Sequence, residues 1–189
     1  DVVVGVPESG IDAAIGYAEA SGIPYEKGIV KNTYIGRTFI KPTQGEREKS
    51  VRLKLNLIPG AFRGKRVVLL DDSIVRGTTC AHIVSMLRDA GAKEVHLRIS
   101  SPPFMWPCYY GTDIPDKDSL IACRHSVEEI GKMSYADSID YLHVENLAPM
   151  LGIQSGFCDA CFTGHYPAPI PKVSMADKKC DYSMPIQRI

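Results

Sequence analysis

The sequence from Val67 to Thr79 is Val-Val-Leu-Leu-Asp-Asp-Ser-Ile-Val-Arg-Gly-Thr-Thr. Its four leading apolar residues predict a strand that is covered on both faces. The apolar spacing from Ala81 to Ala90 predicts a helix, with Thr78 or Thr79 as the N-cap. The polar residues between the two elements are therefore expected to form a turn that joins a strand end to a helix start.

Such a turn is suited to binding a phosphate. Backbone N–H groups at a helix start have no partner within the helix, and they point at whatever occupies the crevice in front of them. The hydroxyls of Ser73, Thr78 and Thr79 add further donors, and Gly77 lets the backbone come close to a ligand. The turn thus predicts an anion site at the end of a strand.

Asp71 and Asp72 give this turn two adjacent carboxylates. Neighbouring residues of a strand point to opposite faces and are not expected to share a proton, so the pair does not suit general acid–base work. It does suit a sugar and its metal, because one carboxylate reaches ribose hydroxyls while the other holds a Mg²⁺ that travels with a diphosphate. The alternative is an ordinary turn whose acids cap the helix.

The whole run resembles the phosphoribosyl diphosphate (PRPP) motif of type I phosphoribosyltransferases, and Asp71–Thr79 is similar to that of the amidophosphoribosyltransferase family. The resemblance implies an enzyme that forms 5-phosphoribosylamine and diphosphate from PRPP and glutamine-derived ammonia, the first committed step of purine synthesis. It implies catalytic roles for Asp71 and Asp72. It also implies that PRPP contacts Ser73, Val75, Arg76, Gly77, Thr78 and Thr79.

Strands and helices alternate along the first half of the chain. This order predicts an α/β fold with a doubly wound parallel sheet, whose ligand lies beyond the C-terminal ends of the strands. The resemblance implies the type I phosphoribosyltransferase fold, with a C-terminal extension that contains prolines and cysteines. The predicted strands are Val2–Val6, Tyr25–Val30, Val67–Leu70 and Glu94–Ile99, and the predicted helices are Ile11–Ala20 and Ala81–Ala90.

Pro7-Glu8-Ser9-Gly10 is a second candidate phosphate loop, because it follows a strand and precedes a helix. A simple N-cap by Ser9 is the alternative. PRPP has two phosphate ends and needs two binding loops, which favours the first interpretation. The resemblance implies that Glu8, Ser9 and Gly10 contact the diphosphate and that Ser9 assists Mg²⁺, although the family more often has Asp at position 8.

The segment from Lys31 to Asn56 carries seven Lys or Arg residues and two Glu residues. A connection of this length in a compact domain is typical of a lid or of a solvated loop. A basic lid over a polyanion would exclude water and stabilise the leaving diphosphate. The stretch Lys31–Phe39 is similar to the flexible catalytic loop of the family, which implies that Lys31, Tyr34 and Arg37 lie near PRPP or inhibitory nucleotides and that Arg37 is catalytic.

The six cysteines include a C-x-x-C pair, Cys158 and Cys161. Such a pair is compatible with a redox dithiol, half a zinc site or two ligands of an iron–sulfur cluster. The iron–sulfur-containing subset of the family implies a [4Fe–4S] cluster held by Cys108, Cys158, Cys161 and a fourth ligand from an upstream segment, so we expect an incomplete cluster here. Three unligated thiols are the alternative. Ordinary buried or surface thiols are expected at Cys80, Cys123 and Cys180.

Charge and organisation limit the partners. The 189 residues carry 22 basic and 22 acidic side chains, which disfavours nucleic acid as a partner, and no apolar run predicts a membrane span. We expect a phosphoribosyltransferase core at 1–111 with a flexible lid at 31–56 and an extension at 112–189 with two cluster cysteines. The chain begins inside a predicted strand, so we expect a fragment that lacks an N-terminal part. The resemblance implies a glutaminase domain whose first residue is a cysteine nucleophile, and we expect that domain to be absent because the first residue here is Asp1. The cytoplasm is the expected location because iron–sulfur sites degrade in oxidising compartments.

The resemblance also implies a homo-oligomer in the full-length enzyme, ammonia supplied by the glutaminase domain, and inhibition by purine nucleotides. Two other functions fit the same fold. One is a PRPP-sensing regulator without catalytic activity, and the other is a phosphoribosyltransferase that salvages a purine or pyrimidine base. Regulators of the first kind usually add a DNA-binding domain and a basic face, and the sequence gives no sign of either.

Overall fold

The centre of the protein is a parallel β-sheet. The computed structural model describes residues 1–32, 55–112, 114, 116–153 and 156–170. The four strands are β1 (Val2–Gly5), β4 (Arg66–Asp71), β5 (Glu94–Ile99) and β6 (Ser138–Tyr141), and they lie in the order β1-β4-β5-β6. Every neighbouring pair is parallel. The predicted α/β class and parallel sheet are confirmed.

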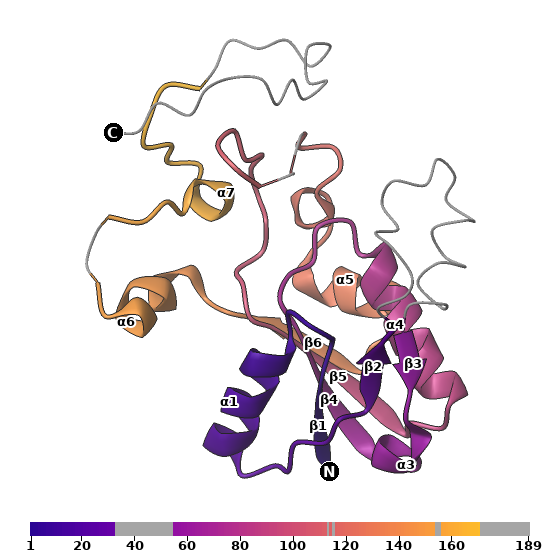
Figure 1. Cartoon of the computed structure of the whole chain (residues 1–189). Helices are drawn as coiled ribbons and strands as arrows, with labels where there is room; N and C mark the ends of the chain where they lie inside the picture. The colour runs from indigo at the N-terminus through magenta and orange to yellow at the C-terminus, as the bar shows by residue number, and fades with distance from the viewer. Residues whose placement is uncertain (33–54, 113, 115, 154–155, 171–189) are drawn as a thin grey trace.

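Helices cover both faces of the sheet, as the term doubly wound requires. Because side chains alternate along a strand, Val3, Val68 and Leu70 pack against α1 (Ile11–Ser21). Residues at the intervening positions pack on the other face against α4 (Thr78–Asp89) and α5 (Val127–Met133). In Figure 1, α1 lies on one side of the strands and α4 and α5 lie on the other.

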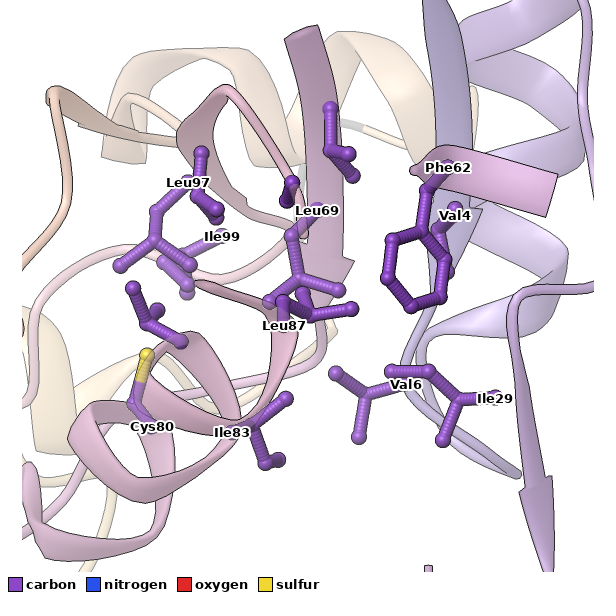
Figure 2. Packing of buried hydrophobic residues seen from close by; sticks show 14 of the residues in the cluster. Val4, Val6, Ile29, Phe62, Leu69, Cys80, Ile83, Leu87, Leu97 and Ile99 are labelled. Atoms are coloured by element: carbon purple, nitrogen blue, oxygen red, sulfur yellow. The ribbon is translucent and has the colours of Figure 1, made fainter. Parts of the chain in front are cut away.

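The main core lies on the face that α4 covers. Phe62, from the short helix α3 (Pro59–Phe62), is fully buried beside Val4 and Leu69 (Figure 2). Ile83 and Leu87 of α4 complete this layer. The apolar run at Val67–Leu70 is therefore buried on both faces because alternate residues serve two different clusters.

The strand predicted at Tyr25–Val30 is wrong in its bounds and partner. Tyr25 forms only an isolated parallel bridge to Val3. The strand β2 is Ile29–Lys31, and it pairs antiparallel with β3 (Leu55–Leu57) in a second, two-stranded sheet. Lys31 pairs with Leu55, so the two ends of the predicted lid lie side by side. Residues 33–54, with Tyr34 and Arg37, lie outside the described residues, and the lid stays a prediction.

Short elements dominate the described part of the chain after residue 101. The 3-10 helices η2 (Ile121–Cys123) and η3 (Val144–Asn146) and the helices α6 (Leu147–Leu151) and α7 (Ala160–Thr163) have three to five residues each. Figure 1 shows α6 and α7 apart from the sheet. The sheet nevertheless takes its fourth strand, β6, from this part of the chain, and a domain division at residue 111 stays a prediction. Within the described ranges, every helix is too short or too polar to cross a membrane.

Candidate functional site

Two loops meet at the C-terminal edge of the sheet. Gly5 of β1 lies opposite Leu70 of β4, and the Val6 N–H donates to the Leu70 carbonyl oxygen at 2.8 Å. The loops that follow, residues 7–10 and 71–79, are therefore neighbours, and we call them the two-loop cradle. Gly10 is required where they touch, since a Cβ there would lie 2.4 Å from the Leu70 carbonyl oxygen.

Serine hydroxyls connect the two loops. Ser9 Oγ donates to Asp72 Oδ1 at 3.0 Å, and Ser73 Oγ donates to Asp72 Oδ2 at 3.0 Å. The residue in the N-cap position of α1 is Gly10, which makes no side-chain cap hydrogen bond. Ser9 is therefore not the cap that the alternative interpretation required. Its hydroxyl fixes the exposed carboxylate of the second loop instead.

The two adjacent aspartates differ in burial. Asp72 is exposed, whereas Asp71 is only 7% exposed and its Oδ1 accepts the Asp72 N–H at 2.9 Å. Burial raises the pKa of Asp71 to about 8, and a hydrogen bond with the Asp72 side chain adds to this rise. The expectation that the two carboxyl groups do not share a proton stays a prediction, although Asp72 lies just beyond the strand whose alternation it was based on.

The second loop leads into α4 through Gly77. The helix begins at Thr78, its N-cap is Gly77 at φ 80°, and no side chain caps it, so the predicted threonine N-cap was wrong. A Cβ on Gly77 would approach Ile121 Cδ1 to 2.7 Å. Thr78 and Thr79 are exposed at the start of this helix, where backbone N–H groups favour an anion.

The other residues of this loop that were predicted to contact PRPP differ in burial. Arg76 is exposed, and Ser73 is half-buried beside Asp72. The side chain of Val75 is partly buried in a satellite apolar cluster, and its carbonyl oxygen accepts the Ile121 N–H at 2.9 Å. Packing and a hydrogen bond to η2 thus stabilise the position of the loop.

An ion pair closes one side of the cradle. Lys31 Nζ at the end of β2 lies 2.9 Å from Glu8 Oε2 in the first loop. The sequence placed both residues near the diphosphate but did not predict that they pair. Their separation along the chain gives no local signal, because the contact depends on how the small β2–β3 sheet sits beside β1.

The cradle offers hydroxyls, three acidic side chains, the Arg76 cation and a helix start, and Lys31 lies beside it. Together these groups suit a phosphorylated sugar. Across the described ranges, no group of three His, Cys, Asp or Glu side chains is placed to hold a metal ion. Mg²⁺ is normally held in such sites by one or two carboxylates together with substrate phosphates. Asp71, Asp72 and the Ser9 hydroxyl fit a metal that arrives with its ligand.

Three cysteines gather around the satellite apolar cluster formed by Phe104, Ile114 and Leu120. Cys108, Cys123 and Cys161 all pack against it. The Cys161 carbonyl oxygen accepts the N–H groups of Met105 and Trp106, both at 3.0 Å, which ties the two cysteine-bearing stretches together. We call residues 101–112 and 156–164 the cysteine segment.

Each predicted cluster cysteine has a different environment. Burial acts to raise the pKa of the Cys108 thiol, but the backbone N–H groups of Tyr110, Thr112 and Gly111 outweigh it and lower the pKa. The Thr112 N–H donates to Cys108 Sγ at 3.3 Å. Burial, followed by the neighbouring Cys108, raises the pKa of Cys161 to about 11, and Cys158 is exposed.

The remaining cysteines follow the expectation where the structure describes them. Cys80 is buried in the main core, where burial raises the pKa of its thiol to about 12. Cys123 Sγ donates to the Met105 carbonyl oxygen at 3.1 Å. Cys180 lies outside the described residues.

A cavity of about 320 Å³ lies beyond the ends of β5 and β6, and sequence analysis did not identify it. Its lining is mainly apolar and includes Pro103, Met105, Val144 and Phe162. The residues of the two-loop cradle do not line it. It forms where distant segments meet, so no short motif marks it.

Comparisons with known proteins agree with the resemblance found in the sequence. No family model matches the sequence. An amidophosphoribosyltransferase of Bacillus subtilis is 57% identical over 175 residues, and one of Archaeoglobus fulgidus is 55% identical over 174 residues. These matches cover 90% of this chain but only 37% and 38% of the relatives, so the chain spans less than two-fifths of their length.

A solved structure matches as well. It is the glutamine phosphoribosylpyrophosphate (PRPP) amidotransferase from B. subtilis complexed with ADP and GMP, with a TM-score of 0.79 and 56% identity. The match covers 91% of this chain and 39% of that chain. The predicted fold class is therefore confirmed by an independent structure.

Proposed function

We propose that this relative of the amidophosphoribosyltransferases is the phosphoribosyltransferase part of such an enzyme and forms 5-phosphoribosylamine and diphosphate from PRPP and ammonia. The observation that carries the proposal is the hydrogen bond from Ser9 to Asp72, which joins the two predicted phosphate loops at one sheet edge. The 52–57% identity to enzymes of that name supports it.

The cradle residues suggest how the reaction proceeds. Ammonia attacks C1 of the ribose while the bond from C1 to the diphosphate oxygen breaks, and the added nitrogen then loses a proton to solvent. Asp71 and Asp72 would hold the ribose hydroxyls and, with Ser9, the Mg²⁺. The phosphates would lie against Ser9, Gly10 and the start of α4. The barrier falls because reactants are positioned and the charge of the departing diphosphate is stabilised, so no strong base is needed. Bound Mg²⁺ would neutralise part of that charge.

The predicted lid supplies the remaining groups in this proposal. Tyr34 and the catalytic Arg37 would approach PRPP from residues 31–56, and Lys31 stands at the near end of that segment, beside the first loop. Closure of a basic segment over the diphosphate would exclude water, which otherwise hydrolyses the C1 cation.

We further propose that Cys108, Cys158 and Cys161 are ligands of a [4Fe–4S] cluster, completed by a residue of the longer enzyme. The N–H groups directed at Cys108 suit a thiolate, and the hydrogen bonds to the Cys161 carbonyl oxygen bring the second stretch close. Four thiolates are the usual ligand set, so this chain purified in air should hold little or no cluster. The longer enzyme, purified without oxygen, should be brown and should lose its colour in Cys158→Ser.

The proposed partners follow from the longer relatives. Ammonia would come from a glutaminase domain, and purine nucleotides would inhibit, in line with the ADP and GMP named in the B. subtilis structure. A homo-oligomer and a cytoplasmic location complete the proposal, with no role for nucleic acid or a membrane.

Release of diphosphate from PRPP tests the proposed activity. With Mg²⁺ present, release should rise with ammonium concentration. Release with a purine or pyrimidine base and none with ammonium would identify a base-salvage enzyme instead. Binding of PRPP without release under any of these conditions would favour a regulator.

A further inference from the structure

The Glu8–Lys31 ion pair changes the charge of the cradle when an anion binds. Lys31 Nζ and Glu8 Oε2 are 2.9 Å apart, and their side chains are 39% and 69% exposed. The contact is therefore accessible to solvent and within reach of an incoming ligand. While the pair is intact, the two charges compensate each other.

A bound diphosphate competes with Glu8 for Lys31. The ammonium is a compact point charge on a flexible stem, so it can turn from a carboxylate to a phosphate. Glu8 is then left beside a polyanion with its own charge uncompensated. Asp72 is a second exposed carboxylate near the ligand, and its oxygens accept hydrogen bonds from Ser9 and Ser73. Besides Lys31, the exposed Arg76 is the cation that the described loops offer.

We propose that Glu8 acts as a charge filter in the first loop, which disfavours bare diphosphate and admits diphosphate that carries Mg²⁺. The inference rests on the proposed function, since it assumes that the first loop binds diphosphate. A divalent cation supplies the positive charge that Glu8 loses when Lys31 turns to the ligand. Without the metal, two unit charges near contact in water repel enough to weaken binding about fivefold, and more where solvent is partly excluded.

Titration calorimetry with sodium diphosphate tests the filter. The ligand is added to the wild-type chain and to Glu8→Gln, once with a metal chelator and once with excess Mg²⁺. We expect Glu8→Gln to bind metal-free diphosphate about five- to tenfold more tightly. Binding of the Mg²⁺ complex should change less than twofold.

Glu128→Gln is the matched control. Glu128 pairs with Lys132 at 2.7 Å on α5, so this variant removes the same charge from the same kind of exposed pair outside the cradle. It should leave both affinities unchanged. Thermal unfolding of all three proteins checks that the exposed substitutions leave the fold intact.

The outcomes distinguish the charge filter from the binding of diphosphate itself. Unchanged affinities in Glu8→Gln, equal tightening with and without Mg²⁺, or weaker binding would each overturn the filter while leaving diphosphate binding in place. A wild-type chain that binds diphosphate in neither condition contradicts the proposed function, and the filter is overturned with it.

Discussion

The two-loop cradle and the cysteine segment carry the two chemistries that the sequence predicts, yet they are built in different ways. The cradle is fixed by the sheet, because paired strands bring its loops together and glycine and serine contacts lock them. The cysteine segment packs on a small satellite cluster, and the described residues do not assemble three metal ligands. Strand pairing therefore positions the cradle, whereas side-chain packing on the satellite cluster positions the cysteine segment.

The largest predicted effect concerns the cradle: the free energy of unfolding should depend on pH because Asp71 changes its protonation state. Its pKa of about 8 in the folded protein lies above the usual 3.8, so the folded state retains a proton that the unfolded state loses. The stability from this proton is complete below about pH 4 and is lost as the pH rises to about 8. The loss is on the order of 3 to 5 kcal/mol.

Urea unfolding at a series of pH values measures this loss. Asp71→Asn should remove the dependence and should be more stable than the wild type at pH 9. Asp118→Asn, an exposed carboxylate outside the cradle, is the control and should follow the wild-type curve. If Asp71→Asn keeps the wild-type slope, Asp71 does not retain its proton in the folded cradle.

A smaller loss is expected from Gly10→Ala. The added Cβ would lie 2.4 Å from the Leu70 backbone, so one of the two loops must move. Overpacking of this kind costs about 1 to 3 kcal/mol. Gly16→Ala in α1 is the matched control, since a Cβ there meets nothing within 4 Å. That change should stabilise the helix by up to about 1 kcal/mol.

Urea unfolding and diphosphate binding are measured on both glycine variants. Gly10→Ala should lose stability and diphosphate affinity together, whereas Gly16→Ala should keep its affinity. Gly10→Ala with wild-type stability and affinity would mean that the close contact between the loops is not needed.

The smallest effect concerns thiol reactivity in the cysteine segment. The thiolate is the reactive form, so iodoacetamide at neutral pH should alkylate the metal-free protein faster at Cys108, whose pKa is lowered, than at Cys161. Cys161 should follow slowly, and Cys80 in the core should be slowest. Mass spectrometry of digested samples gives the order. Cys161 reacting as fast as Cys108 would contradict the difference between their environments.

The sequence predicted those features that depend on residues close together in the chain. Strand, loop and helix follow one another at Val67–Asp89 and Val2–Ser21, and this order alone places both loops at the correct sheet edge. The unbroken apolar run at Val67–Leu70 also predicted the two-sided burial of β4.

Contacts between distant segments could not be predicted. The burial of Asp71 depends on where β4 stops, the cap of α4 depends on space beside Ile121, and the Glu8–Lys31 pair depends on the β2–β3 sheet. The proximity of Cys108 and Cys161 was predicted only through the family resemblance, because it arises from packing between stretches about fifty residues apart in the sequence.

The most direct test of the central claim is titration calorimetry of PRPP with Mg²⁺ into the wild-type chain and into the double variant Asp71→Asn/Asp72→Asn. The two-loop cradle predicts Mg²⁺-dependent binding by the wild type and none by the variant, whose circular dichroism should remain that of a folded protein. Equal PRPP affinity in the two proteins would contradict the claim that these carboxylates hold the ligand.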